Sequence, residues 1–230
     1  MANQNIRLSN LKNHQQVVDF TVEAVYEVDN QNPLGARFRH NQSGFVLDLL
    51  RIQSVPQAFM WVNSHPVSDR GEPHTLEHLL LGKGTKGRYV ASLEEMSLGN
   101  SSAFTAQLRT CYHFHTPAGS SVFFNLFQIK LDAMLHPNFS DEEIRREVRN
   151  MGITNDPVDG SLSLEEKGTV YNEMISSFER PWGNLYFELG KMIYDHDHPS
   201  AYSAGGYPTA IREMKPVHIR NFHNSTHHLN

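Results

Sequence analysis

The segment Pro73-His74-Thr75-Leu76-Glu77-His78-Leu79-Leu80-Leu81-Gly82 separates two parts of the 230-residue chain. A proline at the first helical position and a glycine at the end predict a short helix. Before this segment, apolar and polar residues alternate as strands do, and we expect strands over residues 17–28, 36–40, 45–52 and 59–62. After it, helical patterns dominate. Strands and helices in separate blocks, without regular alternation, indicate an α+β fold.

Helices account for most of the chain beyond this segment. One is expected to begin at Ser140, which is followed by a glutamate three residues later in the pattern of a capping box. The other helices are expected over residues 89–98, 120–135, 164–178, 182–194 and 211–223, and two strands over residues 103–105 and 110–115. No repeat or low-complexity segment interrupts the pattern, and we expect one domain over residues 1–230.

Composition narrows the class of protein. The net charge is -5, so no general electrostatic attraction to nucleic acid is expected. One cysteine excludes an intramolecular disulfide framework and an all-thiolate metal site. No apolar run approaches the ~20 residues that span a bilayer, and no signal or transit peptide is seen, so we expect a cytoplasmic protein without a membrane partner. The 14 histidines stand out, because imidazole is the commonest metal ligand.

The chemistry is concentrated in His74, Glu77 and His78. Residues four apart lie on one face of a helix, so both imidazoles can reach one metal ion. Glu77 is close enough to act as a proton acceptor there. This is the H-x-x-E-H arrangement of the inverzincins. Two histidines do not complete a catalytic zinc site, which usually has three protein ligands, often including a carboxylate.

The third ligand is left open by spacing alone. Glu166 and Glu173 lie seven apart, and we expect them on one face of the helix over residues 164–178. Two histidines and a carboxylate would also suit iron or manganese, and zinc is favoured by the hydrolytic motif. The candidate third ligands are the glutamates of the later helices: Glu142, Glu143, Glu147, Glu165, Glu166, Glu173 and Glu179.

Several blocks of the sequence resemble one enzyme family, in order and with compatible spacing. The first block resembles the inverzincin motif of the pitrilysin/insulysin metallopeptidases, and the set is most similar to their presequence protease and falcilysin branch. The blocks are residues 71–78 (GEPHTLEH), 102–105 (SAFT), 109–112 (RTCY), 131–137 (LDAMLHP), 167–174 (KGTVYNEM) and 203–208 (SAGGYP).

The resemblance implies a fold and a metal site. The fold would be an antiparallel sheet packed by helices, the half-domain of the pitrilysin and mitochondrial processing peptidase type. The chain would be the N-terminal catalytic domain alone, truncated at its C-terminal end. One zinc ion per chain would be bound by His74, His78 and Glu173. Glu77 would be the general base, and Glu166 would support the ligands from behind.

The resemblance also implies a zinc metalloendopeptidase that hydrolyses unstructured peptides. The substrate would add a strand to a sheet edge formed by Ser101, Ser102, Ala103, Phe104 and Thr105. The family usually has asparagine where this chain has Ser102, and a hydroxyl has fewer donors than an amide. The alternative is an inactive zinc-binding fragment, or a partner subunit, that needs a complementary half.

Overall fold

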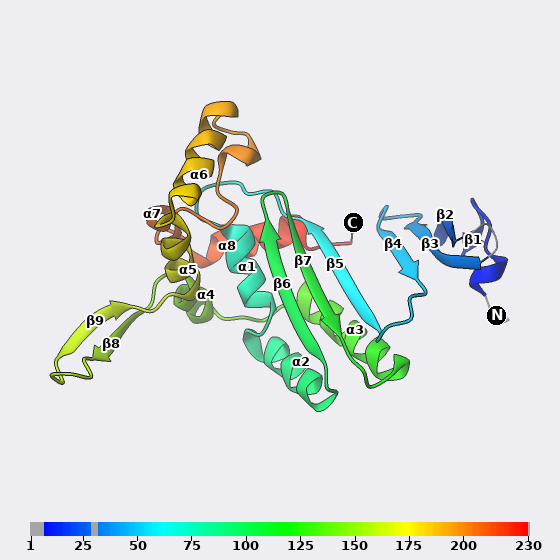
Figure 1. Ribbon diagram of the computed structural model, residues 1–230, viewed down its shortest axis with the longest axis horizontal. Coiled ribbons are helices and arrows are strands. Elements are labelled where there is room, and N and C mark those ends of the chain that lie inside the picture. The colour runs from blue at the N-terminus through cyan, green and yellow to red at the C-terminus, as the bar shows by residue number, and fades with distance from the viewer. Residues whose placement is uncertain (1–6, 29–31, 230) are drawn as a thin grey trace. The chain divides into compact units, whose positions relative to one another are not determined.

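The computed structural model describes residues 7–28 and 32–229 (Figure 1). Contacts group the chain into two compact units, one over Met1–Ser54 with Leu229–Asn230 and one over Val55–His228. Each unit is described by itself. All predicted site residues lie in the second unit, and the expectation of a single catalytic domain over residues 1–230 stays a prediction.

The first unit is an antiparallel sheet in the order β1-β2-β3-β4. Its core consists of Val22, Ala36 and Phe38. The strand predicted over residues 17–28 is divided, because Val18 has a φ of 54° and turns the chain. The elements are η1 (Leu8–Asn10), β1 (Gln16–Val17), β2 (Phe20–Val28), β3 (Asn32–His40) and β4 (Val46–Leu50).

The second unit contains a three-stranded antiparallel sheet in the order β5-β7-β6. The strands are β5 (Gln57–Asn63), β6 (Asn100–Ala106) and β7 (Arg109–His115). Helix α3 (Ser120–Leu135) packs on the sheet, where Phe114 of β7 stacks on Phe123 of α3. Within the described residues β6 pairs on one side only, so it is an edge strand.

A second core lies among helices. Helix α1 (Glu72–Leu80) packs with α4 (Asp141–Val148), α5 (Thr169–Phe178) and α8 (Pro216–Thr226). The remaining elements are α2 (Gly84–Met96), α6 (Pro181–Ile193), η2 (Pro199–Ala201) and α7 (Pro208–Ile211). The fully buried members of this core are Leu76, Leu79, Ile144, Val148, Val170, Ile211, Met214 and Ile219. The α+β fold, an antiparallel sheet packed by helices, is confirmed.

The helix predicted over residues 164–178 is wrong in its first part. Residues Met151–Asn155 and Leu162–Glu166 form a hairpin, β8-β9, that projects from the helices (Figure 1). Helix α5 begins only at Thr169. Glu166 therefore ends a strand and does not share a helix face with Glu173.

The last predicted helix is also shorter than expected. Helix α8 begins at Pro216, not at residue 211, because a proline has no N–H to continue a helix and is favoured at a helix start. Helix α2 is longer than predicted and begins at Gly84. Among the described residues, no helix combines the length and the apolarity needed to cross a membrane.

Candidate metal centre

Helix α1 begins in a tight packing of backbone on backbone. Its N-cap residue, Gly71, has a φ of 75°, which side-chain-bearing residues rarely adopt. A Cβ on Gly71 would lie 2.5 Å from the carbonyl oxygen of Gly205. The start of α1 is therefore fixed against the segment around Gly205, and His74 lies in the next turn.

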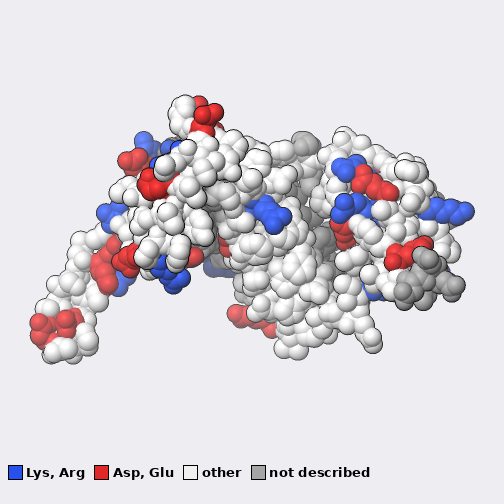
Figure 2. All heavy atoms as spheres, turned by 45° about the horizontal axis from the view of Figure 1, so that its top comes forward, with Lys and Arg blue, Asp and Glu red and all other residues white. Residues whose placement is uncertain are grey.

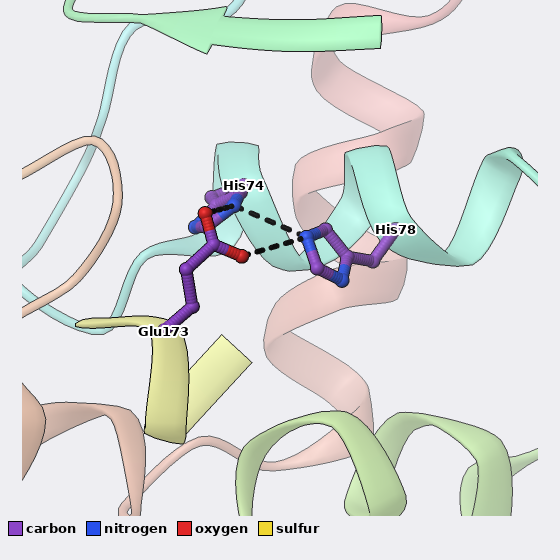
Figure 3. Close-up of side chains that lie close together, drawn as sticks. All are labelled: His74, His78 and Glu173. Carbon is purple, nitrogen blue, oxygen red and sulfur yellow. Dashed lines mark hydrogen bonds and ion pairs between the residues drawn. The ribbon is translucent and has the colours of Figure 1, made fainter. Parts of the chain in front are cut away.

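Three side chains from two helices converge (Figure 3). The Nε2 atoms of His74 and His78 are 3.1 Å apart. The Glu173 carboxylate of α5 faces both rings, with Oε1 3.6 Å from His74 Nε2 and Oε2 3.5 Å from His78 Nε2. These residues form the one group of three or more His, Cys, Asp or Glu side chains found with metal-binding spacing among the described residues.

The spacing of these atoms fits a tetrahedral metal ion. Bonds of about 2.1 Å from a zinc ion to nitrogen or oxygen place neighbouring ligand atoms about 3.4 Å apart. The three separations of 3.1, 3.5 and 3.6 Å lie close to that value. Two imidazoles and one carboxylate are a common ligand set of catalytic zinc, with the fourth position left open. The residues present therefore fit the ion that the motif implies.

The pKa values of the two imidazoles are shifted in opposite directions, down at His74 and up at His78. Burial lowers the pKa of His74, and the neighbouring His78 lowers it further. Burial also lowers the pKa of His78, but Glu147, Glu77 and Glu173 outweigh burial, and the net shift is upward. Uncharged imidazole is the form that binds a metal ion, and burial favours that form most clearly at His74.

Glu77 is held by a chain of hydroxyl groups. The Thr105 hydroxyl of β6 donates to Oε2 of Glu77 over 2.7 Å. Because an ionised carboxylate only accepts, Thr105 must accept from Thr110, 3.2 Å away. Thr110 in turn accepts from the buried Ser64 over 2.7 Å. This series of hydroxyl groups holds one carboxylate oxygen of Glu77 in place and leaves the other oxygen available.

These groups open into one cleft of about 550 Å³. Glu77, both histidines and Glu173 line it, together with Ala103, Phe104 and Thr105 of β6. The other two residues of the predicted edge do not line it. The Ser101 hydroxyl donates to Glu94, and the Ser102 hydroxyl lies 3.5 Å from Nδ1 of His113. The remaining lining residues are Ala106, Gln107, Met174, Ser203, Ala204 and Gly205.

Glu166 is not among the residues that line this cleft. Its carboxylate accepts from the main-chain N–H groups of Asn150 and Gly168 and pairs with Arg212 at 2.8 Å. The carboxylate behind His78 is instead Glu147 of α4, with Oε2 3.2 Å from Nδ1 of His78. Glu147 stood among the candidate third ligands, but no local pattern distinguished it from its neighbours.

Sequence reasoning also missed Gln107. Its side-chain amide, in the turn between β6 and β7, donates to the carbonyl oxygens of Pro199 and Tyr202 at 3.0 and 2.6 Å. This link joins the edge strand to the segment that ends at Gly205. A lone glutamine in a turn carries no signal that would have revealed it.

Positive and negative side chains are mixed on the surface drawn in Figure 2. On the face drawn in Figure 2, Lys and Arg side chains lie beside Asp and Glu side chains around the hairpin β8-β9 and α6. The described residues on this face form no continuous basic area. A polyanion would find alternating charges there.

Comparison with known proteins agrees with the geometry. No protein-family model matches the chain. It is 28% identical over 216 residues to a mitochondrial presequence protease of Gibberella zeae, covering 91% of this chain. Its fold is similar to that of pitrilysin, with a TM-score of 0.64, 19% identity and 91% of this chain covered. Its fold is also similar to that of an inactive peptidase domain from Pseudomonas fluorescens, with a TM-score of 0.59, 12% identity and 79% of this chain covered.

The matches cover only part of the larger proteins. The chain spans 21% of the Gibberella zeae presequence protease, 22% of the pitrilysin chain and 41% of the Pseudomonas fluorescens chain. This partial coverage fits a half-domain. The sequence similarity to presequence proteases, which reaches 31% identity over 88% of this chain in the protein of Candida albicans, shows that the chain belongs to the pitrilysin family of metallopeptidases, and the structural similarity shows that it shares their fold.

Proposed function

We propose that the chain is the catalytic domain of a zinc-dependent endopeptidase that cleaves extended, unstructured peptides. The observation that carries the proposal is the triangle of His74, His78 and Glu173 beside Glu77 in one open cleft. One zinc ion per chain would occupy the triangle. When bound, zinc supplies a Lewis acid that polarises a peptide carbonyl and makes water more acidic.

Glu77 performs the proton transfers. Its free carboxylate oxygen takes a proton from the attacking water and later returns that proton to the leaving amine. The Thr105 hydroxyl donates a hydrogen bond of 2.7 Å to the other oxygen, Oε2, and so holds the carboxylate in one orientation. Positioning of this kind removes the entropy cost of orienting the base during the reaction.

The edge of β6 explains which substrates would be accepted. A peptide in extended form can pair with the free main-chain groups of β6 and pass beside Glu77. Main-chain pairing does not depend on side-chain identity, and a folded protein does not offer an extended strand. The substrate class is therefore defined by conformation more than by sequence.

The direct test measures metal content and turnover separately. The wild-type chain is expected to bind one zinc ion and to cleave a generic unstructured peptide, and chelation is expected to abolish cleavage. Glu77→Gln is expected to keep the zinc and lose activity about 100- to 10,000-fold. Glu179→Gln, outside the cleft lining, is the matched control and is expected to behave as the wild type. A folded wild-type chain that binds no zinc would contradict the proposal.

A second candidate function is a zinc-binding half that is inactive alone. The small share of the relatives that the chain covers and the 56% exposure of the Glu173 side chain favour it. A complementary half or a second subunit would then cover the cleft and complete substrate binding. This version predicts stoichiometric zinc without cleavage, and cleavage when the remaining part of a presequence protease is added.

A further inference from the structure

The back of the His78 ring faces a buried carboxylate. Nε2 of His78 faces His74 and Glu173, whereas Nδ1 on the other side of the ring lies 3.2 Å from Oε2 of Glu147. Glu147 is 1% exposed. An ionised carboxylate at such a site needs partners, because an unpaired buried charge is costly.

A lysine satisfies the second oxygen of Glu147. Nζ of Lys83 lies 2.9 Å from Oε1. Lys83 follows α1 directly, and its main-chain N–H donates to the carbonyl oxygen of Leu79 over 3.0 Å. The lysine is therefore attached to the end of the same helix that carries His78. Each oxygen of Glu147 thus has its own donor, and both donors come from one short stretch of chain.

Core packing fixes the position of Glu147. Its neighbour Val148 and Ile144, one turn earlier on α4, are both fully buried. They belong to the same core cluster as Leu76 and Leu79 of α1. The carboxylate is thus presented to His78 by two helices that are locked together. A close-packed contact of this kind sets the position of a side chain precisely.

We propose that Glu147, backed by Lys83, is a positioning residue that fixes the His78 ring with its proton on Nδ1 and its lone pair on Nε2. A neutral imidazole carries one proton, and a carboxylate can only accept, so the proton belongs on the side of Glu147. Nε2 is then free to bind a metal ion without a rotation of the ring. The inference rests on the proposed zinc site.

The arrangement assigns to Glu147 the supporting role that the sequence suggested for Glu166. The Glu166 carboxylate is used at the base of the hairpin, by Asn150, Gly168 and Arg212. Glu166 is therefore a matched control, since it has the same side chain and also accepts several hydrogen bonds.

The test compares zinc affinity across a small set of variants, by competition with a chromophoric chelator. Glu147→Leu removes the acceptor and is expected to weaken zinc binding about 10- to 100-fold. Glu147→Gln keeps an acceptor oxygen and is expected to recover part of that loss. Glu166→Leu is expected to bind zinc as the wild type does. Substitution of cobalt for zinc adds a second readout, because the visible absorption of bound cobalt is expected to change in Glu147→Leu and not in Glu166→Leu.

Lys83→Met keeps the inference testable if Glu147→Leu does not fold. Lys83 is 41% exposed, so this substitution opens no cavity in the core, and it is expected to weaken zinc binding in the same direction by a smaller factor. Unchanged zinc affinity in folded Glu147→Leu, or an equal loss in Glu166→Leu, would overturn the inference and leave the proposed function standing. A wild-type chain without zinc affinity would overturn both.

Discussion

The two helices that build the candidate metal centre differ in how deeply they are buried. Helix α1 is buried along almost its whole length, including the polar residues Glu72, His74, Thr75 and Glu77. Helix α5 has one buried residue, Val170, and its Glu173 side chain is 56% exposed. The candidate site thus combines a rigid part, which carries two of the proposed ligands and the proposed base, with a looser part, which carries the proposed third ligand.

This difference separates two tasks. The buried helix keeps the imidazoles and the base in register, since side chains in a close-packed interior occupy fixed positions. Under the proposed function, the exposed helix would supply a carboxylate that has room to move toward an incoming ion. A preformed half and an adjustable half would allow the metal to enter without opening the core.

Removing a ligand from the rigid helix should be the most damaging change. His74→Ala is expected to weaken zinc binding by more than about 100-fold, because direct ligation exceeds the effect of groups behind the ligands. Glu173→Ala is expected to cost less, since both imidazoles remain in place. Competition with a chelator measures both, with the 90% exposed His196 replaced by alanine as a control. A larger loss in Glu173→Ala than in His74→Ala would contradict the division.

The start of α1 should tolerate no side chain. Gly71→Ala places a Cβ 2.5 Å from the carbonyl oxygen of Gly205 at a φ of 75°. Strain and overlap together are expected to lower the free energy of unfolding by about 2–4 kcal/mol, measured by urea denaturation. Gly82→Ala at the other end of α1 meets nothing within 4 Å and should be nearly neutral. Equal effects of the two substitutions would show that the start of α1 is not rigidly packed.

The hydroxyl chain should affect catalysis and not metal binding. Thr105→Val removes the donor to Glu77 with little change in shape, and kcat is expected to fall about 10-fold, the equivalent of one hydrogen bond to a charged group. KM and zinc content should stay close to those of the wild type. Thr105→Ser keeps the hydroxyl and should restore most of kcat. A fall in zinc content equal to the fall in kcat would speak against a role in holding the base.

Acid should release a contact that joins α4 to α2, the helix that follows α1. Glu143 of α4 accepts from the N–H of Gly84 over 2.9 Å and pairs with Arg88 of α2. Burial alone would raise the pKa of Glu143, but the hydrogen bonds from Ser140, Gly84 and Arg88 outweigh it and lower the pKa to about 2. A lowered pKa contributes stability that is complete above the unfolded value and is lost as the pH falls toward the folded value.

Glu143→Gln is therefore expected to cost about 1–2 kcal/mol of unfolding free energy at pH 7. The difference from the wild type should shrink below about pH 4 and vanish near pH 2. Urea denaturation at several pH values measures it, and Glu142→Gln, with a 60% exposed side chain, is the control. A difference that grows on acidification would contradict the assignment.

The part of the site that depends on local spacing was predictable from the sequence. His74, Glu77 and His78 lie within one helical repeat, so their shared face follows from helix geometry. Glu173 could be chosen only through the resemblance, because several glutamates had equivalent local surroundings. Glu147 was not predictable, since it meets His78 across 69 residues of sequence. Which glutamate reaches the ring is decided by how α4 packs on α1.

Prediction of the fold from the sequence was limited in the same way, by contacts between distant segments. The strands of the first unit and most helices followed from hydrophobic periodicity, and so did the α+β class. The hairpin β8-β9 was missed because its second strand, Leu162–Glu166, is short and contains glutamates that are common in helices. Pairing with Met151–Asn155 decides its conformation, and a pairing between segments is not visible in either segment alone.

The open edge of β6 also favours self-association as the protein concentration rises. Its main-chain groups could pair with any extended polypeptide, and an unfolded copy of this chain is one. Ala103, Phe104 and Ala106 carry no charge that would repel such a copy, and uncharged free edges are the usual starting points of edge-to-edge aggregation. A lysine at this edge would improve solubility and reduce peptide binding together. Under the proposed function, breadth of substrate and resistance to self-association would therefore be opposed in the same few residues.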